Sequence, residues 1–417
     1  MGAQNDALHL VRPMSLTDQF PGWEDEYGLP GEPRSFTKES FDELLVHATR
    51  KGASDITLQT EEPVYAYIEG RNLRITKRAL SSHEIETITN HIYGSNGVSR
   101  IRGGEDIDTR YPVVRRAPNE AGSMVVVEKL GFRVNITGCW ARGDDNGMQI
   151  TCRTIKASPP RLGEMKVEEG IIEHFFPEQG LVCVCGPTGS GKSTLLAGAM
   201  REVIEQPDSH KKIITLEAPI EYTYDDIDRA SALVSQHEVP RHLKSFARGV
   251  RNTLRRAPKI ILVGESRDGE TVEASLEASQ TGHTVYTTVH SNSVANTIAR
   301  MANMFPPNER MTKVFELVES LRMVVVQRLV RKVDGTGRVA LREFLAFDQA
   351  VRDQLRVVTS LREAEHTLAK LVEKRGQTML SAAQRAFDAG LISPDTMAIF
   401  ERESKSSLIE DLGMNFN

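Results

Sequence analysis

The sequence predicts an α/β protein with more than one domain. Residues 186–193 read Gly-Pro-Thr-Gly-Ser-Gly-Lys-Ser, between an apolar run at 181–185 and a helix-like segment at 193–200. Further apolar runs at 212–216, 260–263 and 284–289 alternate with helical patterns, which is typical of a parallel sheet. A chain of 417 residues is also too long for one ordinary core.

The first predicted domain covers residues 36–155. Phe41, Leu44, Leu45 and Ala48 recur at helical spacing, and the helix ends before a glycine at position 52. Short runs rich in β-branched and aromatic residues predict strands after it, at 56–58, 64–68, 73–75, 124–127, 132–137 and 149–155.

The rest of the chain is predicted from composition and pattern. Residues 1–35 are rich in proline, glycine and acids without periodicity, and we interpret them as a mobile segment. Residues 156–168 begin with Lys-Ala-Ser-Pro-Pro and are predicted to be an interdomain linker. The alternating strands and helices occupy 169–348, and 349–417 is a charged helical region in which Ser393 caps a helix that begins with Pro394.

The octet at 186–193 fits the phosphate-binding loop pattern in its required context of strand, loop and helix. Its glycines allow successive N–H groups to turn toward a polyphosphate, and the helix N-terminus adds partial positive charge. The pattern predicts ATP with Mg²⁺ as ligands: Lys192 reaches the β- and γ-phosphates and the Ser193 hydroxyl holds Mg²⁺. The predicted binding residues are Gly186, Pro187, Thr188, Gly189, Ser190, Gly191, Lys192, Ser193 and Thr194.

Two acids end predicted parallel strands. Glu265 follows the run 260–263, and such an acid lies beside Mg²⁺ and its waters in phosphate-loop ATPases; a solvated acid at a strand end is the alternative. Glu217 ends the run 212–216 and is expected at the same sheet edge, where a carboxylate can orient the attacking water. The alternative for Glu217 is a cap on the turn at Pro219.

Two histidines bracket the last predicted strand of the core. Their spacing makes a poor metal pair, and no third ligand supports a zinc site. His290 follows the strand, where it can sense the γ-phosphate or hydrogen-bond Glu265. His283 precedes the strand, and a structural role competes with any catalytic one.

A helix predicted at 242–257 has one basic side and one apolar side. Its basic stripe comprises Arg241, Lys244, Arg248, Arg251 and Arg255, opposite Leu243, Phe246, Ala247, Val250 and Leu254. A solvated face is the ordinary interpretation; an acidic neighbouring subunit, anionic lipid or nucleic acid are the alternatives. The formal net charge of −5 argues against a dedicated nucleic-acid binder.

Compartment is predicted from what the sequence lacks. It contains no apolar run of 18 residues and no recognisable signal peptide. Its four cysteines show neither C-x-x-C spacing nor disulfide-rich density, and Cys183 and Cys185 share one face of a strand as small buried hydrophobes. These features fit a reducing cytoplasm.

Several ordered strings resemble the traffic ATPases of type II and type IV secretion and type IV pili. The likeness is greatest to the PilT/DotB-like branch, which includes pilus-retraction ATPases and ATPases of Dot/Icm secretion and conjugative plasmids. It covers residues 36–400 and rests on 52–55 and 132–135 in the first domain, the acidic box 217–221, the Walker B region 260–268, the histidine box 281–290 and a helical string at 390–393.

The resemblance implies an N-terminal PAS-like domain, a RecA-like ATPase core and a helical C-terminal extension, assembled as a homohexamer. It implies nucleotide held between the two domains of a subunit, with Glu217 as the catalytic glutamate and Glu265 as the Walker B acid that holds Mg²⁺ through water. Arg142 and Arg153 match the N-terminal-domain arginines that approach the phosphates. Such guanidinium groups can neutralise charge on the transferred phosphoryl group.

The resemblance also implies a cytoplasmic motor, peripheral to the inner membrane, that docks on a secretion, conjugation or pilus platform. Two positions depart from the family pattern: Ala218 stands where many relatives have a second acid, and Lys259 where they commonly have aspartate. Glu217 is therefore expected to act alone. A nucleic-acid translocase on a RecA-like core and a nucleotide-gated assembly scaffold are the alternative functions.

Overall fold

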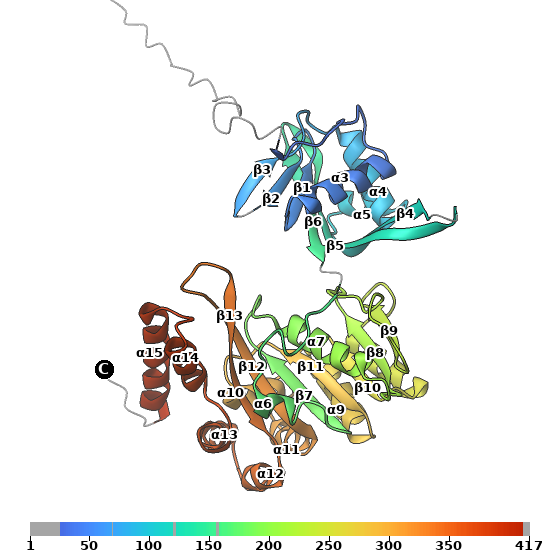
Figure 1. The fold of residues 1–417 in the computed structure, drawn as a ribbon. Helices are drawn as coiled ribbons and strands as arrows, with labels where there is room; N and C mark the ends of the chain where they lie inside the picture. The colour runs from blue at the N-terminus through green and yellow to red at the C-terminus, as the bar shows by residue number, and fades with distance from the viewer. Residues whose placement is uncertain (1–25, 69, 120–121, 156–157, 412–417) are drawn as a thin grey trace, which may run out of the picture. The chain divides into compact units, whose positions relative to one another are not determined.

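The computed structural model describes residues 26–68, 70–119, 122–155 and 158–411 (Figure 1). The chain forms two compact units, 1–155 and 156–417. The start of the predicted mobile segment, 1–25, the linker residues 156 and 157, and residues 412–417 lie outside the described residues. Among the helices of the described part, none combines the length and apolar character needed to cross a membrane.

Over its described residues, the first unit is a six-stranded antiparallel sheet with three helices. Its strand order is β3-β2-β1-β6-β5-β4. The strands are β1 (Asp55–Gln59), β2 (Tyr65–Ile68), β3 (Arg71–Arg74), β4 (Ile107–Pro118), β5 (Met124–Ala141) and β6 (Asp144–Ile155). The helices are α3 (Lys38–Arg50), α4 (Ser82–Tyr93) and α5 (Gly97–Arg102).

One face of this sheet is buried under the helices and the other is polar. Alternation along β1 and β6 turns Ile56, Leu58 and Ile150 into a core shared with α3 and α4. The residues between them, such as Asp55 and Arg153, lie on the opposite face. The predicted helix and the strands at 56–58, 64–68 and 149–155 are confirmed.

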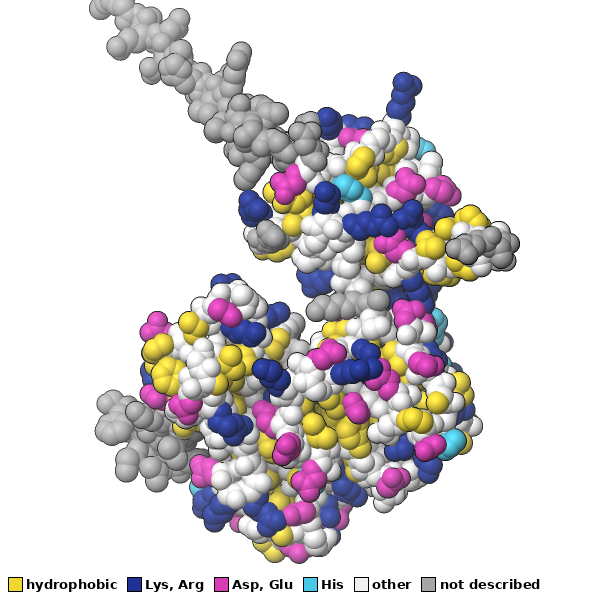
Figure 2. Space-filling model, in the orientation of Figure 1, with side chains coloured by type: hydrophobic (Ala, Val, Ile, Leu, Met, Phe, Trp, Pro, Cys, Tyr) yellow, Lys and Arg dark blue, Asp and Glu magenta, His cyan; other side chains and the backbone are white. Residues whose placement is uncertain are grey.

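Two details of the first unit differ from the predictions. Residues 26–35 are not free of the domain: the backbone N–H of Leu29 donates to Ile75, and the Glu32 carboxylate accepts from the N–H groups of Lys77 and Arg78. The strands predicted at 124–127 and 132–137 are one strand, β5, because β4 pairs with it along its whole length up to residue 136. The outer end of this hairpin exposes Met124, Val125, Val126 and Val127, an apolar patch visible in Figure 2.

The second unit has a seven-stranded sheet with order β13-β12-β7-β11-β10-β8-β9, parallel except for β13. The strands are β7 (Gly180–Cys185), β8 (Lys212–Glu217), β9 (Leu233–Glu238), β10 (Ile260–Val263), β11 (Thr284–Val289), β12 (Leu321–Arg331) and β13 (Arg338–Ala346). The four strands predicted for this unit, β7, β8, β10 and β11, are confirmed, as is the α/β class.

Helices cover both faces of the second sheet. They are α6 (Glu169–Ile172), α7 (Lys192–Glu205), α8 (Phe246–Thr253), α9 (Gly269–Gln280), α10 (Val294–Ala302) and α11 (Arg310–Ser320), with a 3₁₀ turn η1 (Leu254–Arg256). Val182 and Val184 of β7 pack with α7 on one face, and Leu181, Cys183 and Cys185 pack with α9, α10 and α11 on the other. A strand buried on both faces explains the continuous apolar run.

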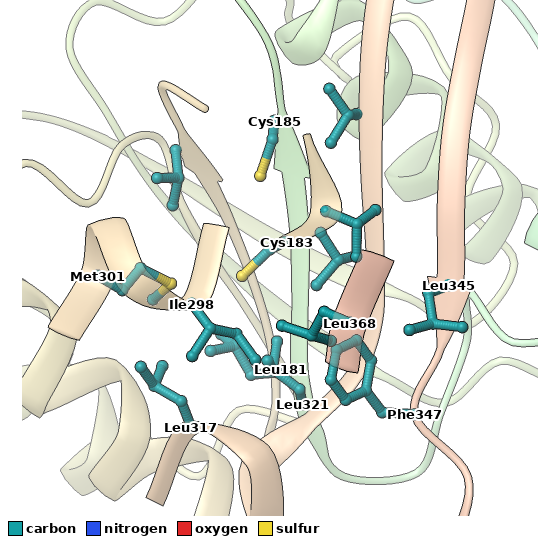
Figure 3. Packing of buried hydrophobic residues seen from close by; sticks show 14 of the residues in the cluster. Leu181, Cys183, Cys185, Ile298, Met301, Leu317, Leu321, Leu345, Phe347 and Leu368 are labelled. Atoms are coloured by element: carbon teal, nitrogen blue, oxygen red, sulfur yellow. The ribbon is translucent and has the colours of Figure 1, made fainter. Parts of the chain in front are cut away.

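The C-terminal helices share the core of the second unit. They are α12 (Gln349–Leu355), α13 (Leu361–Arg375), α14 (Met379–Asp388) and α15 (Pro394–Asp411). Leu368 of α13 packs with Leu181, Cys183 and Phe347, as Figure 3 shows. Ser393 caps α15 as predicted, accepting from the N–H of Thr396 at 3.2 Å.

Candidate active site

The phosphate-binding loop joins the carboxyl end of β7 to the start of α7. Gly186, Gly189 and Gly191 have φ values of 139°, 76° and 83°. Residues with a Cβ rarely adopt such positive values. A Cβ on Gly186 would lie 2.3 Å from the carbonyl oxygen of Gln327, and one on Gly191 2.8 Å from its Nε2. The backbone conformation therefore requires glycine at all three positions, and close packing requires it also at Gly186 and Gly191.

The loop presents polar groups that suit an anion. Lys192 is buried, and its ammonium donates to the carbonyl oxygens of Gly186 (2.9 Å) and Pro187 (3.0 Å). Burial lowers the pKa of Lys192. The buried hydroxyl of Ser190 has no hydrogen-bond partner among the described residues. The lysine and the unpartnered hydroxyl, at a helix N-terminus, fit a polyphosphate.

Ser193 and Thr194 follow in the first turn of α7. Ser193 keeps partial exposure. The Thr194 hydroxyl lies 2.9 Å from the hydroxyl of Tyr222. Tyr222 comes from the segment after β8, so this contact ties the start of α7 to the predicted acidic box.

Glu217 ends β8, and two side chains hold one of its carboxylate oxygens. Its Oε1 accepts from the Thr215 hydroxyl at 2.6 Å and from Gln236 Nε2 at 3.1 Å. Although the residue keeps partial exposure, the surrounding protein desolvates its carboxyl group and raises the pKa to about 7. These two hydrogen bonds and one from the backbone of Glu221 favour the ionised form but do not outweigh this desolvation. Glu217 is thus a carboxyl group that exchanges protons near neutral pH.

Glu265 lies just beyond β10 and contacts two cationic or ionisable side chains. His290 Nε2 lies 3.1 Å from its Oε1, and Arg267 donates to its Oε2 at 2.6 Å. This hydrogen bond raises the pKa of Arg267. The predicted contact between His290 and Glu265 is present. Glu265 is therefore a half-buried acid whose two oxygens are both engaged.

The strand register brings these groups to one edge of the sheet. Val289 of β11 pairs with Cys185, and Val263 of β10 pairs with Leu216, so the residues that follow these four positions meet at the same edge. The loop, Glu217, Glu265 and His290 all lie there. His283 lies at the opposite edge, where its Nδ1 is 3.0 Å from the Ala278 carbonyl and its own carbonyl accepts from Gly180. The structure thus gives His283 a structural contact and places it apart from the loop.

Arg142 and Arg153 belong to the first unit, and each pairs with an acid of the same unit. Arg153 Nε lies 2.7 Å from Asp55 Oδ1, and Arg142 Nη2 lies 3.0 Å from Glu62 Oε1. Both side chains are 66% exposed. Glu62 also borders a polar cavity of about 250 Å³ on the exposed sheet face, lined by Thr57, Gln59, Glu62, Pro63, Tyr65, Asn72 and Gln149. A role of these arginines toward the phosphates stays a prediction.

The basic stripe is shorter than predicted. The helix is α8, which begins at Phe246 after the Ser245 cap, so Arg241 and Lys244 lie in the turn before it. Arg251 pairs with Glu270 at 2.6 Å, and Ala247 and Val250 are buried as expected. The predicted continuous cationic face is therefore broken by the helix start and by an acidic partner.

The sequence did not predict several of the residues that contact the site. Thr215 lies two positions before Glu217 on the same strand face, so period-two alternation could have found it. Gln236 is on β9, an edge strand too polar to be recognised. Gln327 of β12 contacts the loop and Arg342 of β13 contacts Gln327, and both contacts depend on strand order.

Comparison with known proteins agrees with this arrangement. Residues 32–393 match the family described as Type II/IV secretion system protein. The type IV pilus retraction ATPase PilT of Pseudomonas aeruginosa is 35% identical over 314 residues, 75% of this chain and 84% of that protein. The X-ray structure of the Legionella pneumophila ATPase DotB is 45% identical, has a TM-score of 0.81, and is matched over 90% of this chain and 98% of that one.

A second solved structure carries a nucleotide. The crystal structure of the pilus retraction motor PilT with bound ADP is 28% identical, with a TM-score of 0.72, over 86% of this chain and 96% of that one. The predicted architecture, an N-terminal domain followed by a C-terminal ATPase domain, is confirmed. The chain belongs to the type II/IV secretion system protein family, and within it is a PilT/DotB-like traffic ATPase.

Proposed function

We propose that this chain hydrolyses ATP at the loop edge of the second unit to drive a type IV secretion, conjugation or pilus apparatus. The observation that carries the proposal is the convergence of Lys192, Glu217 and Glu265 at one sheet edge. A phosphate-binding loop with two carboxylates is the equipment of phosphoryl transfer to water. Family membership supports the same activity.

Glu217 is the proposed general base. Its pKa near 7 lets it accept a proton from water at neutral pH and release it again, which is the range in which a base is most effective. Thr215 and Gln236 hold one oxygen, Oε1, and leave the other outside these two bonds. That second oxygen is proposed to orient the attacking water in line with the γ-phosphate.

Lys192 is proposed to leave the carbonyls of Gly186 and Pro187 and bind the β- and γ-phosphates. Ser193 and, through water, Glu265 would hold Mg²⁺, which neutralises phosphate charge when bound. His290 and Arg267 keep Glu265 oriented through its two oxygens. The unpartnered Ser190 hydroxyl supplies a further donor to the loop.

Arg142 and Arg153 are proposed to complete the site from the N-terminal domain. A guanidinium that contacts the γ-phosphate holds ATP better than ADP, and such differential affinity converts hydrolysis into domain movement. We further propose a homohexamer in the cytoplasm that docks on inner-membrane platform proteins. Resemblance to the pilus and secretion ATPases supports this assembly.

Phosphate release by the purified chain with Mg²⁺ and ATP tests the proposal. We expect Lys192→Ala to reduce turnover to background. Glu217→Gln is expected to bind ATP normally and hydrolyse it about 100-fold more slowly or worse, because a general base contributes at least that much. Glu319→Gln is the matched control and should retain wild-type turnover, because it removes only the ion pair between Glu319 on α11 and Arg356 at the end of α12. Normal turnover by Glu217→Gln would exclude the proposed base.

Complementation separates the motor from a nucleotide-gated scaffold. A Glu217→Gln chain that binds ATP but hydrolyses it slowly should fail to support secretion or pilus function in cells that lack the wild-type gene. Full function with the slow variant would mean that binding alone suffices, and the motor proposal would be wrong.

A further inference from the structure

A buried glutamine packs directly beneath the phosphate-binding loop. Gln327 of β12 is 3% exposed and follows Val326, the register partner of Cys185 at the end of β7. Its Nε2 donates to the carbonyl oxygen of Ser190 at 2.6 Å. Its backbone carbonyl and its Nε2 are also the atoms that a Cβ on Gly186 or Gly191 would strike. Gln327 therefore contacts the loop at three of its residues.

Arg342 determines which way the carboxamide of Gln327 points. It is the register partner of Gln327 on β13, is 2% exposed, and donates through Nε to Gln327 Oε1 at 2.7 Å. A guanidinium can only donate, so it binds the amide oxygen and leaves the amide nitrogen facing the loop. Only a side chain with an acceptor on one side and a donor on the other satisfies both neighbours.

The same arginine connects the loop to two distant segments. Its Nη1 donates to Glu168 Oε2 at 2.9 Å, and both terminal nitrogens reach backbone carbonyls at 165 and 166. Its own carbonyl accepts from Gln377 Nε2 at 2.6 Å, and Gln377 Oε1 accepts from Arg385 of α14. Residues 165–168 lead in from the first unit, and α14 belongs to the C-terminal helices.

We propose that Gln327, oriented by Arg342, is a positioning residue for the phosphate-binding loop. It fixes the Ser190 carbonyl, and thereby keeps the loop N–H groups turned toward the triphosphate. Because Arg342 also contacts residues 165–168 and, through Gln377, α14, the conformation of the loop depends on the positions of these two segments. The role in catalysis rests on the proposed ATP site; the effect on loop structure does not.

Gln327→Glu is the sharpest test, because it keeps the acceptor for Arg342 and removes the donor to Ser190. Without nucleotide, amide hydrogen exchange at residues 186–192 is expected to become about fivefold faster or more, because the variant loses one hydrogen bond to the loop. Exchange in β8 and β10 is expected to stay as slow as in the wild type. KM for ATP is expected to rise about tenfold, with a smaller change in kcat. Gln280→Glu, at the opposite edge, where the wild-type side chain bonds Ser320, is the matched control and should change neither quantity.

Unchanged loop exchange in Gln327→Glu would overturn the proposal, and so would an equal increase across the whole second unit. Arg342→Lys, which retains a donor for Gln327, is expected to recover most of the protection that Arg342→Met loses. If the variants of Gln327 and Arg342 do not fold, Arg385→Ala is the test, because Arg385 is exposed and its replacement should not prevent folding. This variant is expected to increase hydrogen exchange of the loop about twofold. Exchange equal to that of the wild type would contradict the link between the loop and α14. Because exchange is measured without ATP, a chain that does not hydrolyse ATP can still pass or fail this test.

Discussion

The two sheets of this protein hold their functional candidates in opposite ways. The parallel sheet of the second unit ends all its central strands at one edge, so Glu217, Glu265 and His290 meet the loop by topology alone. The antiparallel sheet of the first unit spreads its polar residues over a face, where Arg153 pairs with Asp55 and Arg133 with Asp108. A parallel sheet thus brings its strand-end residues together at one edge, whereas the polar residues of the antiparallel sheet pair with one another across an exposed face.

The largest expected effect concerns those arginines. Arg153→Ala should reduce kcat about 1000-fold, because a guanidinium on the transferred phosphoryl group contributes that much, while ATP affinity changes less. Arg133→Ala is the matched control, because Arg133 is the register partner of Arg153 on β5, is partly exposed and also pairs with an aspartate. It should retain turnover within about twofold. Equal losses in the two variants, measured as steady-state phosphate release, would mean that the face acts as a whole and not through Arg153.

The pH dependence of kcat tests the second unit. A base must be ionised to act, and the pKa of Glu217 is about 7, so kcat should rise about tenfold per pH unit below 7 and level off above it. Thr215→Val removes a hydrogen bond that favours the ionised carboxylate, and should move this limb to higher pH. A kcat that does not change between pH 5.5 and 7, the range just below the raised pKa, would contradict the role of Glu217 as general base.

Variants of the two histidines test whether the two ends of strand β11 differ in function. His290→Ala removes the contact with Glu265 at the loop edge and should lower kcat about tenfold, the effect of losing a hydrogen bond to a charged group. His283→Ala removes a contact with the Ala278 carbonyl at the far edge and should leave kcat within about twofold. Single-turnover hydrolysis measures both. A larger loss of kcat in His283→Ala than in His290→Ala would contradict the prediction that the catalytic residues lie at the loop edge of the sheet.

The smallest effect is on stability. The folded pKa of Glu217 is raised above its unfolded value, so the neutral form is favoured on folding, and this preference is lost as pH rises through about 7. Glu217→Gln cannot ionise, and should therefore raise the melting temperature by about 2–4 °C at pH 8 and by less at pH 5. Melting curves by differential scanning calorimetry check this. A lower melting temperature at pH 8 would show that the ionised carboxylate stabilises the fold.

Much of the second unit could be predicted because its central strands are buried on both faces. Strands β7, β8, β10 and β11 appear as continuous apolar runs, and the glycine loop marks where the first one ends. The run Val324–Val326 in β12 is equally apolar, but nothing local indicates that it pairs with β7. For this reason the contact of Gln327 with the loop could not be inferred from sequence.

The first unit was harder to predict because its hairpin lies partly outside the core. The end of β5 that carries Met124–Val127 is exposed on both faces, so burial imposes no alternation there. Helix α4 does have a local signal, a capping box in which Ser81 and Glu84 bond each other's backbone N–H groups. The ion pairs of Arg142 and Arg153 depend on which strands are neighbours, and sequence spacing does not reveal that.

The burial of three cysteines makes the wild-type chain suitable for site-selective labelling. Cys152, Cys183 and Cys185 are fully buried, and desolvation raises the pKa of each thiol, that of Cys185 to about 12. Cys139 on β5 is the partly exposed one of the four, although partial burial raises the pKa of its thiol as well. A maleimide fluorophore should therefore attach first to the N-terminal domain, without any engineered residue. Such a probe would report on that domain while nucleotide is added to the other.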